Sequence, residues 1–161
     1  MRARIVSDTQ YGPALISLIR AAFHRCWCSV FIVDPSPARD HDLMVYGILT
    51  ELARCRWRGA DVRLLIGGSR TNFQIAEVSD TARALAGQLR LPCRWLSSQN
   101  VRSSHVKMVL ADDFALTGSH NWSGGALGGQ SQDSVIVESP AMVAYLCSLF
   151  EAQWARAERA K

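Results

Sequence analysis

Short apolar runs alternate with amphipathic helical stretches along most of the chain. Residues 28–33 and 61–66 are mostly apolar and rich in β-branched side chains, and proline or glycine follows each run. Around these runs, apolar residues recur every three or four positions, as they do on one face of a helix. Strands that alternate with helices build a sheet that helices cover on both faces. The pattern therefore predicts an α/β fold with a mixed, mostly parallel sheet flanked by helices on both faces.

The same reading places the individual elements. Helices are expected after Gly12-Pro13 with apolar positions through Phe23, over about 42–57, over about 72–89 with Thr71 or Asn72 as its cap, and over 142–154. Further strands are expected at 93–96, 106–111, 114–117 and 135–137, with a tight hairpin at Asp112–Asp113. Because 161 residues suit one ordinary domain, we expect a single domain over residues 1–161.

Five cysteines are present, and none of them forms a C-x-x-C pair. Their density is far below that of a disulfide scaffold, so we expect reduced and mostly buried thiols. The N-terminus has no uninterrupted apolar run of the kind found in signal peptides, and no stretch reaches membrane-spanning length. We therefore expect an intracellular protein without a stable membrane association.

The chain is basic, with a net charge of +4 and a pI near 9.0. Of its 18 Lys and Arg residues only Lys107 and Lys161 are lysines, which leaves 16 arginines. The excess of arginine favours a partner that carries phosphate groups. A basic surface that only keeps the protein in solution is the alternative.

Polar residues with regular spacing are concentrated between positions 105 and 122. His105-x-Lys107 is followed by Asp112 after four residues, and then by Gly118-Ser119-x-Asn121. Side chains two positions apart in a strand share a face, so His105 and Lys107 are expected to project together. An imidazole beside an ammonium group is suited to bind an anion.

This segment resembles the signature of the phospholipase D superfamily, H-x-K-x-x-x-x-D followed by G-S-x-N. Most members carry two such motifs, whereas this chain has one copy. Single-motif members, such as a small bacterial endonuclease, build one active site from two identical chains. The resemblance therefore implies a phospholipase D-like fold and a homodimer.

The chemistry of phosphodiester cleavage leads to the same pairing. A covalent mechanism needs a neutral imidazole to attack phosphorus and a protonated group for the departing alkoxide, and one ring cannot serve both roles at once. Two copies of His105 would serve them. Two copies each of Lys107 and Asn121, with Ser119 beside them at the signature spacing, would surround the phosphate oxygens without a metal.

Two acidic residues accompany this motif. Asp133 is expected to orient the imidazole of His105, because the single-motif enzymes that the chain resembles carry Glu at this place. Asp112 is expected to make structural hydrogen bonds near the hairpin. The segment from Asp112 to Gly118 is one residue shorter than the usual pattern, and Asp at position 133 reaches less far than Glu.

Residues around the motif would contact substrate. Arg70 and Arg102 are expected to hold phosphates that neighbour the scissile one. His120 is expected at the surface or at the substrate rim, and Trp122 could stack on a base, although packing is the more common role of a tryptophan. A metal site formed by His105, His120 and a nearby Asp or Cys fits no common zinc spacing, so neither a metal nor another cofactor is expected.

The sequence therefore predicts a metal-independent phosphodiesterase, namely a homodimeric endonuclease that cleaves DNA or RNA through a phosphohistidine. One alternative is a hydrolase of phospholipids such as cardiolipin. A second is a nucleic-acid-binding module that has the fold but no turnover. The apolar stripes are assigned to the core, which argues against a lipid substrate.

Overall fold

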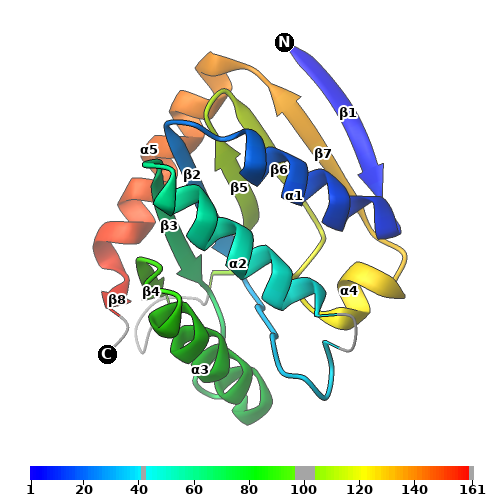
Figure 1. The fold of residues 1–161 in the computed structure, drawn as a ribbon, viewed down its shortest axis with the longest axis vertical. Coiled ribbons are helices and arrows are strands. Elements are labelled where there is room, and N and C mark those ends of the chain that lie inside the picture. Colours follow the sequence, from blue (N-terminus) through cyan, green and yellow to red (C-terminus); the bar gives the residue numbers. More distant parts are fainter. Residues whose placement is uncertain (41–42, 97–103, 160–161) are drawn as a thin grey trace.

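The computed structural model describes residues 1–40, 43–96 and 104–159 (Figure 1). Its strands are β1 (Arg2–Ser7), β2 (Arg25–Val30), β3 (Asp61–Ile66), β4 (Cys93–Trp95), β5 (Lys107–Ala111), β6 (Phe114–Gly118), β7 (Asp133–Glu138) and β8 (Glu158–Arg159). Its helices are α1 (Tyr11–Ala21), α2 (Met44–Trp57), α3 (Phe73–Gln88), α4 (Gly124–Gly128) and α5 (Pro140–Arg156), with a 3-10 turn at Asp8–Gln10. The strands form one eight-stranded sheet in the order β1-β7-β6-β5-β2-β3-β4-β8.

The sheet is mixed, and most of its strand pairs are antiparallel. Only β2–β3 and β3–β4 pair in parallel among the described strands. The prediction of an α/β fold with a mixed sheet is confirmed, but the expectation of a mostly parallel sheet is wrong. Beyond the predicted hairpin of β5 and β6, strand β5 also pairs antiparallel with β2, and the edge strands β1 and β8 add further antiparallel pairs.

Helices cover both faces of the sheet. Figure 1 shows α1 and α2 in front of the sheet and α5 behind it. The larger core lies on the face covered by α1, α2 and α3, and includes Leu15, Ile48 and Leu64. The smaller core lies under α5, where the ring of Phe150 stacks on Trp27 at 5.2 Å. All five cysteines are buried and free, as expected.

Side chains define where the helices begin. The Asn72 side chain accepts a hydrogen bond from the backbone N–H of Ile75 and caps α3. The carboxylate of Asp40 accepts bonds from the second and third residues of α2, Val45 at 3.1 Å and Tyr46 at 3.0 Å. None of the helices in the described part of the chain combines the length and apolarity needed to cross a membrane.

The register of the central strands determines where the polar residues of the motif meet. Strand β5 runs antiparallel to β2, with Lys107 opposite Val30. The start of β5 therefore lies beside the carboxyl end of β2, and β6 ends next to it. Ligand sites of α/β proteins usually form at such a junction of strand ends.

Candidate active site

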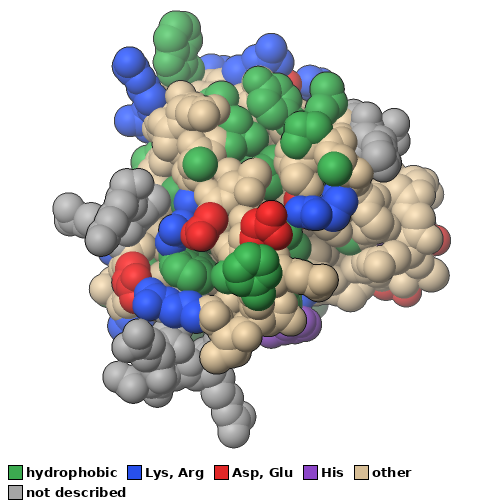
Figure 2. All heavy atoms as spheres, turned by 90° about the horizontal axis from the view of Figure 1, so that it is seen from below, with side chains coloured by type: hydrophobic (Ala, Val, Ile, Leu, Met, Phe, Trp, Pro, Cys, Tyr) green, Lys and Arg blue, Asp and Glu red, His purple; other side chains and the backbone are tan. Residues whose placement is uncertain are grey.

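His105 and Lys107 contact each other at the start of β5. The ammonium nitrogen Nζ of Lys107 lies 3.1 Å from Nδ1 and 3.4 Å from Nε2 of His105. It also donates to the carbonyl oxygen of His105 at 2.9 Å. Lys107 is 7% exposed, whereas His105 is open to solvent. Figure 2 shows the molecule from below, with a histidine at the surface near a group of acidic and basic side chains.

The surroundings of both groups weaken their attraction for protons. Partial burial, together with the positive charge of Lys107, lowers the pKa of His105 below its ordinary value. Burial also lowers the pKa of Lys107. The arrangement favours a neutral imidazole near pH 7, which is the form that can act as a nucleophile.

Phe31, just beyond β2, packs against both groups. Its ring centroid lies 4.4 Å from that of His105, and Nζ of Lys107 lies 5.2 Å from the Phe31 centroid. A cation at this distance is attracted by the ring face. Sequence reasoning missed Phe31, although an aromatic residue at the end of a predicted strand was a usable signal.

Asn121 is held beside the same segment. Its side-chain oxygen accepts a hydrogen bond from the backbone N–H of Ile32 at 3.2 Å. The next residue, Trp122, donates its own N–H to the carbonyl of Ile32 at 2.9 Å. Asn121 is therefore bonded to the residue that follows Phe31 in the chain. This contact places His105, Lys107 and Asn121 at the same end of the sheet.

Ser119 and Asp133 bond to each other rather than to His105. The Ser119 hydroxyl donates to the carbonyl of Asp133 at 3.1 Å, and the Asp133 carboxylate accepts from the Ser7 hydroxyl at 2.5 Å. The structure thus differs from the predicted contact between Asp133 and His105. Asp133 begins β7, which is two strands away from β5, a separation of about 10 Å.

Asp112 makes structural hydrogen bonds at the opposite end of β5. Its carboxylate accepts the backbone N–H groups of Phe23 at 2.8 Å, His24 at 3.0 Å and Arg25 at 2.8 Å. Burial alone would raise the pKa of Asp112, but these N–H groups more than offset burial and lower it. The aspartate of the motif joins the β5–β6 turn to the segment before β2.

His120 and Trp122 are not at the substrate rim, because both are completely buried. The His120 ring stacks on Tyr11 at 4.2 Å, and its Nδ1 lies 2.8 Å from the Ser134 hydroxyl. The Trp122 ring nitrogen donates to the Tyr11 hydroxyl at 3.2 Å. The segment after β6 turns beneath α1, which explains why the prediction of substrate contacts for these two residues differs from the structure.

The two arginines predicted to bind phosphates have different outcomes. Arg70 bonds to both carboxylate oxygens of Glu158 and packs over the ring of Trp95 at 4.8 Å. Its guanidinium is therefore already engaged by an acid. Arg102 lies outside the described residues. Within residues 1–40, 43–96 and 104–159, no group of three His, Cys, Asp or Glu side chains is placed to hold a metal ion.

Solved structures with the same fold cover nearly the whole chain. Nuc from Salmonella typhimurium, described as a phospholipase D family member, is 18% identical, with a TM-score of 0.78 and 98% of each chain covered. NucT from Helicobacter pylori is 13% identical, with a TM-score of 0.74 and 98% of each chain covered. The archaeal chromatin protein TrmBL2 is 14% identical, with a TM-score of 0.62; the match covers 99% of this chain and 54% of TrmBL2.

Comparison with curated protein sequences finds no match. The family model described as "Cardiolipin synthase, PLD-like domain" matches residues 15–154. This span includes most of the fold and the complete motif from His105 to Asn121, and it confirms the resemblance that the motif indicated. The chain therefore belongs to the phospholipase D-like domain family, within the phospholipase D superfamily.

Proposed function

We propose that the protein is a metal-independent phosphodiesterase, specifically a homodimeric endonuclease that cleaves DNA or RNA through a phosphohistidine. The observation that carries this proposal is the exposed His105 imidazole, with the buried Lys107 ammonium 3.1 Å from its Nδ1. The first group can reach a phosphate from solvent. The second lowers the proton affinity of the first and can attract the phosphate oxygens.

In the first step a nitrogen of His105 attacks phosphorus, and the bond between phosphorus and the leaving oxygen breaks. The partner's His105, protonated at that moment, gives its proton to the leaving oxygen. In the second step the now neutral ring of the partner's His105 takes a proton from water. The water oxygen attacks phosphorus and the N–P bond breaks, which restores both rings. Lys107 and Asn121 from the two chains would hold the non-bridging oxygens.

The dimer is needed because this mechanism gives two different roles to two histidines. Among the described residues one histidine, His105, lies at this end of the sheet, because His120 is buried in the core and His24 follows α1 at the far end of β2. In this proposal the second proton carrier comes from another chain. The orienting role predicted for Asp133 remains part of this proposal, with assembly of the dimer bringing a carboxylate of the partner chain to the imidazole.

Nucleic acid is the favoured substrate because of charge. The chain has 18 basic and 14 acidic residues, and arginine pairs well with backbone phosphates. The structurally similar TrmBL2 is described as binding DNA. Phospholipid hydrolysis is the second candidate, and the observation that favours it is the match to a family described by cardiolipin synthase.

The deciding experiment is an activity panel in EDTA with plasmid DNA, single-stranded DNA, RNA and cardiolipin vesicles. We expect cleavage of nucleic acid by the wild type and none by His105→Ala, with His24→Ala as the control histidine exposed at the other end of β2. Cleavage that persists in His105→Ala would refute the catalytic assignment. Salt-sensitive DNA binding without cleavage or a trapped phosphohistidine would instead favour a binding module.

Light scattering tests the shared site. We expect a dimer at concentrations where the enzyme is active, whereas an active monomer would contradict the mechanism. Mixing and refolding wild type with excess His105→Ala should reduce activity more than dilution alone, because mixed dimers lack one of the two imidazoles.

A further inference from the structure

A cavity of about 680 Å³ lies at the same end of the sheet as the motif. Its walls come from the segment after β2, from the first two turns of α3 and from the start of α4. The residues used in this inference are Ile32, Asp34, Arg39, Gln74, Ile75, Glu77 and Val78, and the space they line is called the α3 cavity. Its size is typical of a site for a small organic group.

The α3 cavity shares a wall with the proposed catalytic residues. Ile32 lines it, and the backbone N–H of Ile32 bonds to the side chain of Asn121. The residue before Ile32 is Phe31, whose ring contacts His105. The proposed catalytic residues and the α3 cavity therefore adjoin consecutive residues of one segment, Phe31 and Ile32.

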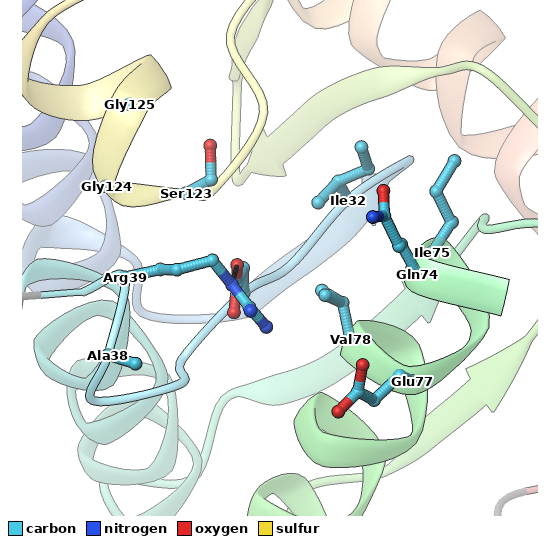
Figure 3. Close-up of a pocket in the computed structure, with 11 residues that line it drawn as sticks. Ile32, Ala38, Arg39, Gln74, Ile75, Glu77, Val78, Ser123, Gly124 and Gly125 are labelled. Carbon is cyan, nitrogen blue, oxygen red and sulfur yellow. Dashed lines mark hydrogen bonds and ion pairs between the residues drawn. The ribbon is translucent and has the colours of Figure 1, made fainter.

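The lining combines apolar and polar groups. Ile32, Ile75 and Val78 provide aliphatic surface. Figure 3 shows the guanidinium of Arg39 extending into the space between α4 and α3, with the side chains of Glu77 and Val78 on the α3 side. The Nε of Arg39 donates to Asp34 at 2.6 Å, which fixes the orientation of the guanidinium.

The charges of the lining limit what can bind. Arg39 contributes one positive charge, and Asp34 and Glu77 contribute two negative charges. A second phosphate would be repelled by these carboxylates, and a lipid acyl chain would have to desolvate three charged groups. A flat heterocycle can pack against the aliphatic walls with its faces. Its donors and acceptors can bond to the guanidinium, carboxylate and amide groups of the lining.

We propose that the α3 cavity binds the nucleobase attached to one side of the scissile phosphate. This inference rests on the proposed nuclease function and adds a base-binding subsite to it. The base packs between Ile32, Ile75 and Val78, while Glu77 accepts from its N–H groups and Arg39 and Gln74 bond to its ring acceptors. The strand must then be single or locally opened, because a paired base cannot enter a cavity.

The test measures binding without turnover, in the His105→Ala background. Calorimetric titrations compare nucleoside 5′-monophosphates with ribose 5-phosphate, which lacks the base, and with phosphoethanolamine, which represents an amine-bearing lipid headgroup. We expect at least one nucleotide to bind about tenfold more tightly than ribose 5-phosphate, which corresponds to about 1.4 kcal/mol.

Two variants address the α3 cavity by different means. Glu77→Gln removes the carboxylate, and Ile75→Trp fills the space. Each should reduce the preference for nucleotide over ribose 5-phosphate to about twofold or less. Asp80→Asn and Ala84→Trp make the same changes at exposed positions of α3 outside the α3 cavity, and should keep the preference.

Equal binding of nucleotide and ribose 5-phosphate by the parent protein would overturn the proposal. A preference that survives in both cavity variants would also overturn it, as would tighter, Glu77-dependent binding of phosphoethanolamine. Because no cleavage is needed, loss of the base preference is distinguishable from failure of the nuclease proposal, which the EDTA activity panel reports separately.

Discussion

The Lys107 ammonium lies 3.1 Å from Nδ1 of His105, and the two side chains differ sharply in exposure. The lysine is enclosed by protein, while the imidazole faces solvent. At this contact distance the charge of Lys107 acts directly on His105 and, after burial, is the second cause that lowers its pKa. The pKa of His105 therefore depends on the charge of Lys107.

Loss of the Lys107 charge should raise the pKa of His105. Burial and the Lys107 charge both lower this pKa. In the wild type the imidazole should therefore stay neutral at pH values where an ordinary histidine, with a pKa of about 6.5, is already protonated. In Lys107→Met only the effect of burial remains, and the pKa measured by NMR titration should move upward. Arg56→Met, which removes an exposed charge from the last turn of α2, serves as the control. An unchanged or lower His105 pKa in Lys107→Met would contradict this account.

Phe31 should be required for the position and the low proton affinity of His105. Replacing it by Ala removes the ring that lies 4.4 Å from the imidazole, so kcat should fall about tenfold. The acidic limb of the activity profile should also move to higher pH, since more water reaches His105. Phe31→Leu should restore part of the lost kcat and part of the shift in the acidic limb. Phe23→Ala, at an exposed phenylalanine on the far end of the sheet, should change neither.

The sequence predicted that His105 and Lys107 project together, because residues two positions apart in an extended chain share a face, although β5 itself begins only at Lys107. The contact of Phe31 with His105 and the separation of Asp133 from His105 depend on strand order and on the register that sets Val30 opposite Lys107, which spacing along the chain does not determine. Strand β1 was missed for a related reason. It is an edge strand in which Ala3 and Ile5 are exposed and only Val6 is buried, so no buried apolar face marks it in the sequence.

His120 should be structural, and its removal should destabilise the fold. The ring is fully buried against Tyr11, so His120→Ala should lower the free energy of unfolding by about 3 kcal/mol. Burial lowers the pKa of His120, so the unfolded chain binds more protons than the folded one. Wild-type stability should therefore decline as the pH falls below about 6.5.

His120→Phe keeps a ring beside Tyr11 but cannot titrate. Urea unfolding at neutral and mildly acidic pH should show a smaller decline for this variant than for the wild type. An equal decline in both proteins would assign the pH dependence to other groups.

Asp112 should stabilise the fold through its three backbone acceptor contacts. Asp112→Ala leaves the N–H groups of Phe23, His24 and Arg25 without the carboxylate, which should cost about 2 kcal/mol. Because the folded-state pKa of Asp112 is lowered, this contribution is present above about pH 4 and is lost as the pH falls through the lowered value. Chemical unfolding of Asp113→Ala, at the exposed neighbour, gives the comparison. Similar losses in the two variants would argue against a specific role for Asp112.

Gly67 should be essential for activity, although it contributes no side chain. A Cβ at this position would overlap the carbonyl oxygen of Ser104 and would lie 3.0 Å from the Cα of Phe31. Ser104 precedes His105, and Phe31 contacts it, so Gly67→Ala must displace the backbone on two sides of the imidazole. We expect kcat to fall about a hundredfold, since a shift of about 1 Å is enough for such a loss.

Gly47→Ala in α2 is the control, because its Cβ meets no atom within 4 Å. That variant should keep full activity and gain up to about 1 kcal/mol of stability from its higher helix propensity. Normal activity in folded Gly67→Ala would show that the site tolerates a displaced His105 backbone, which the proposed in-line attack does not allow.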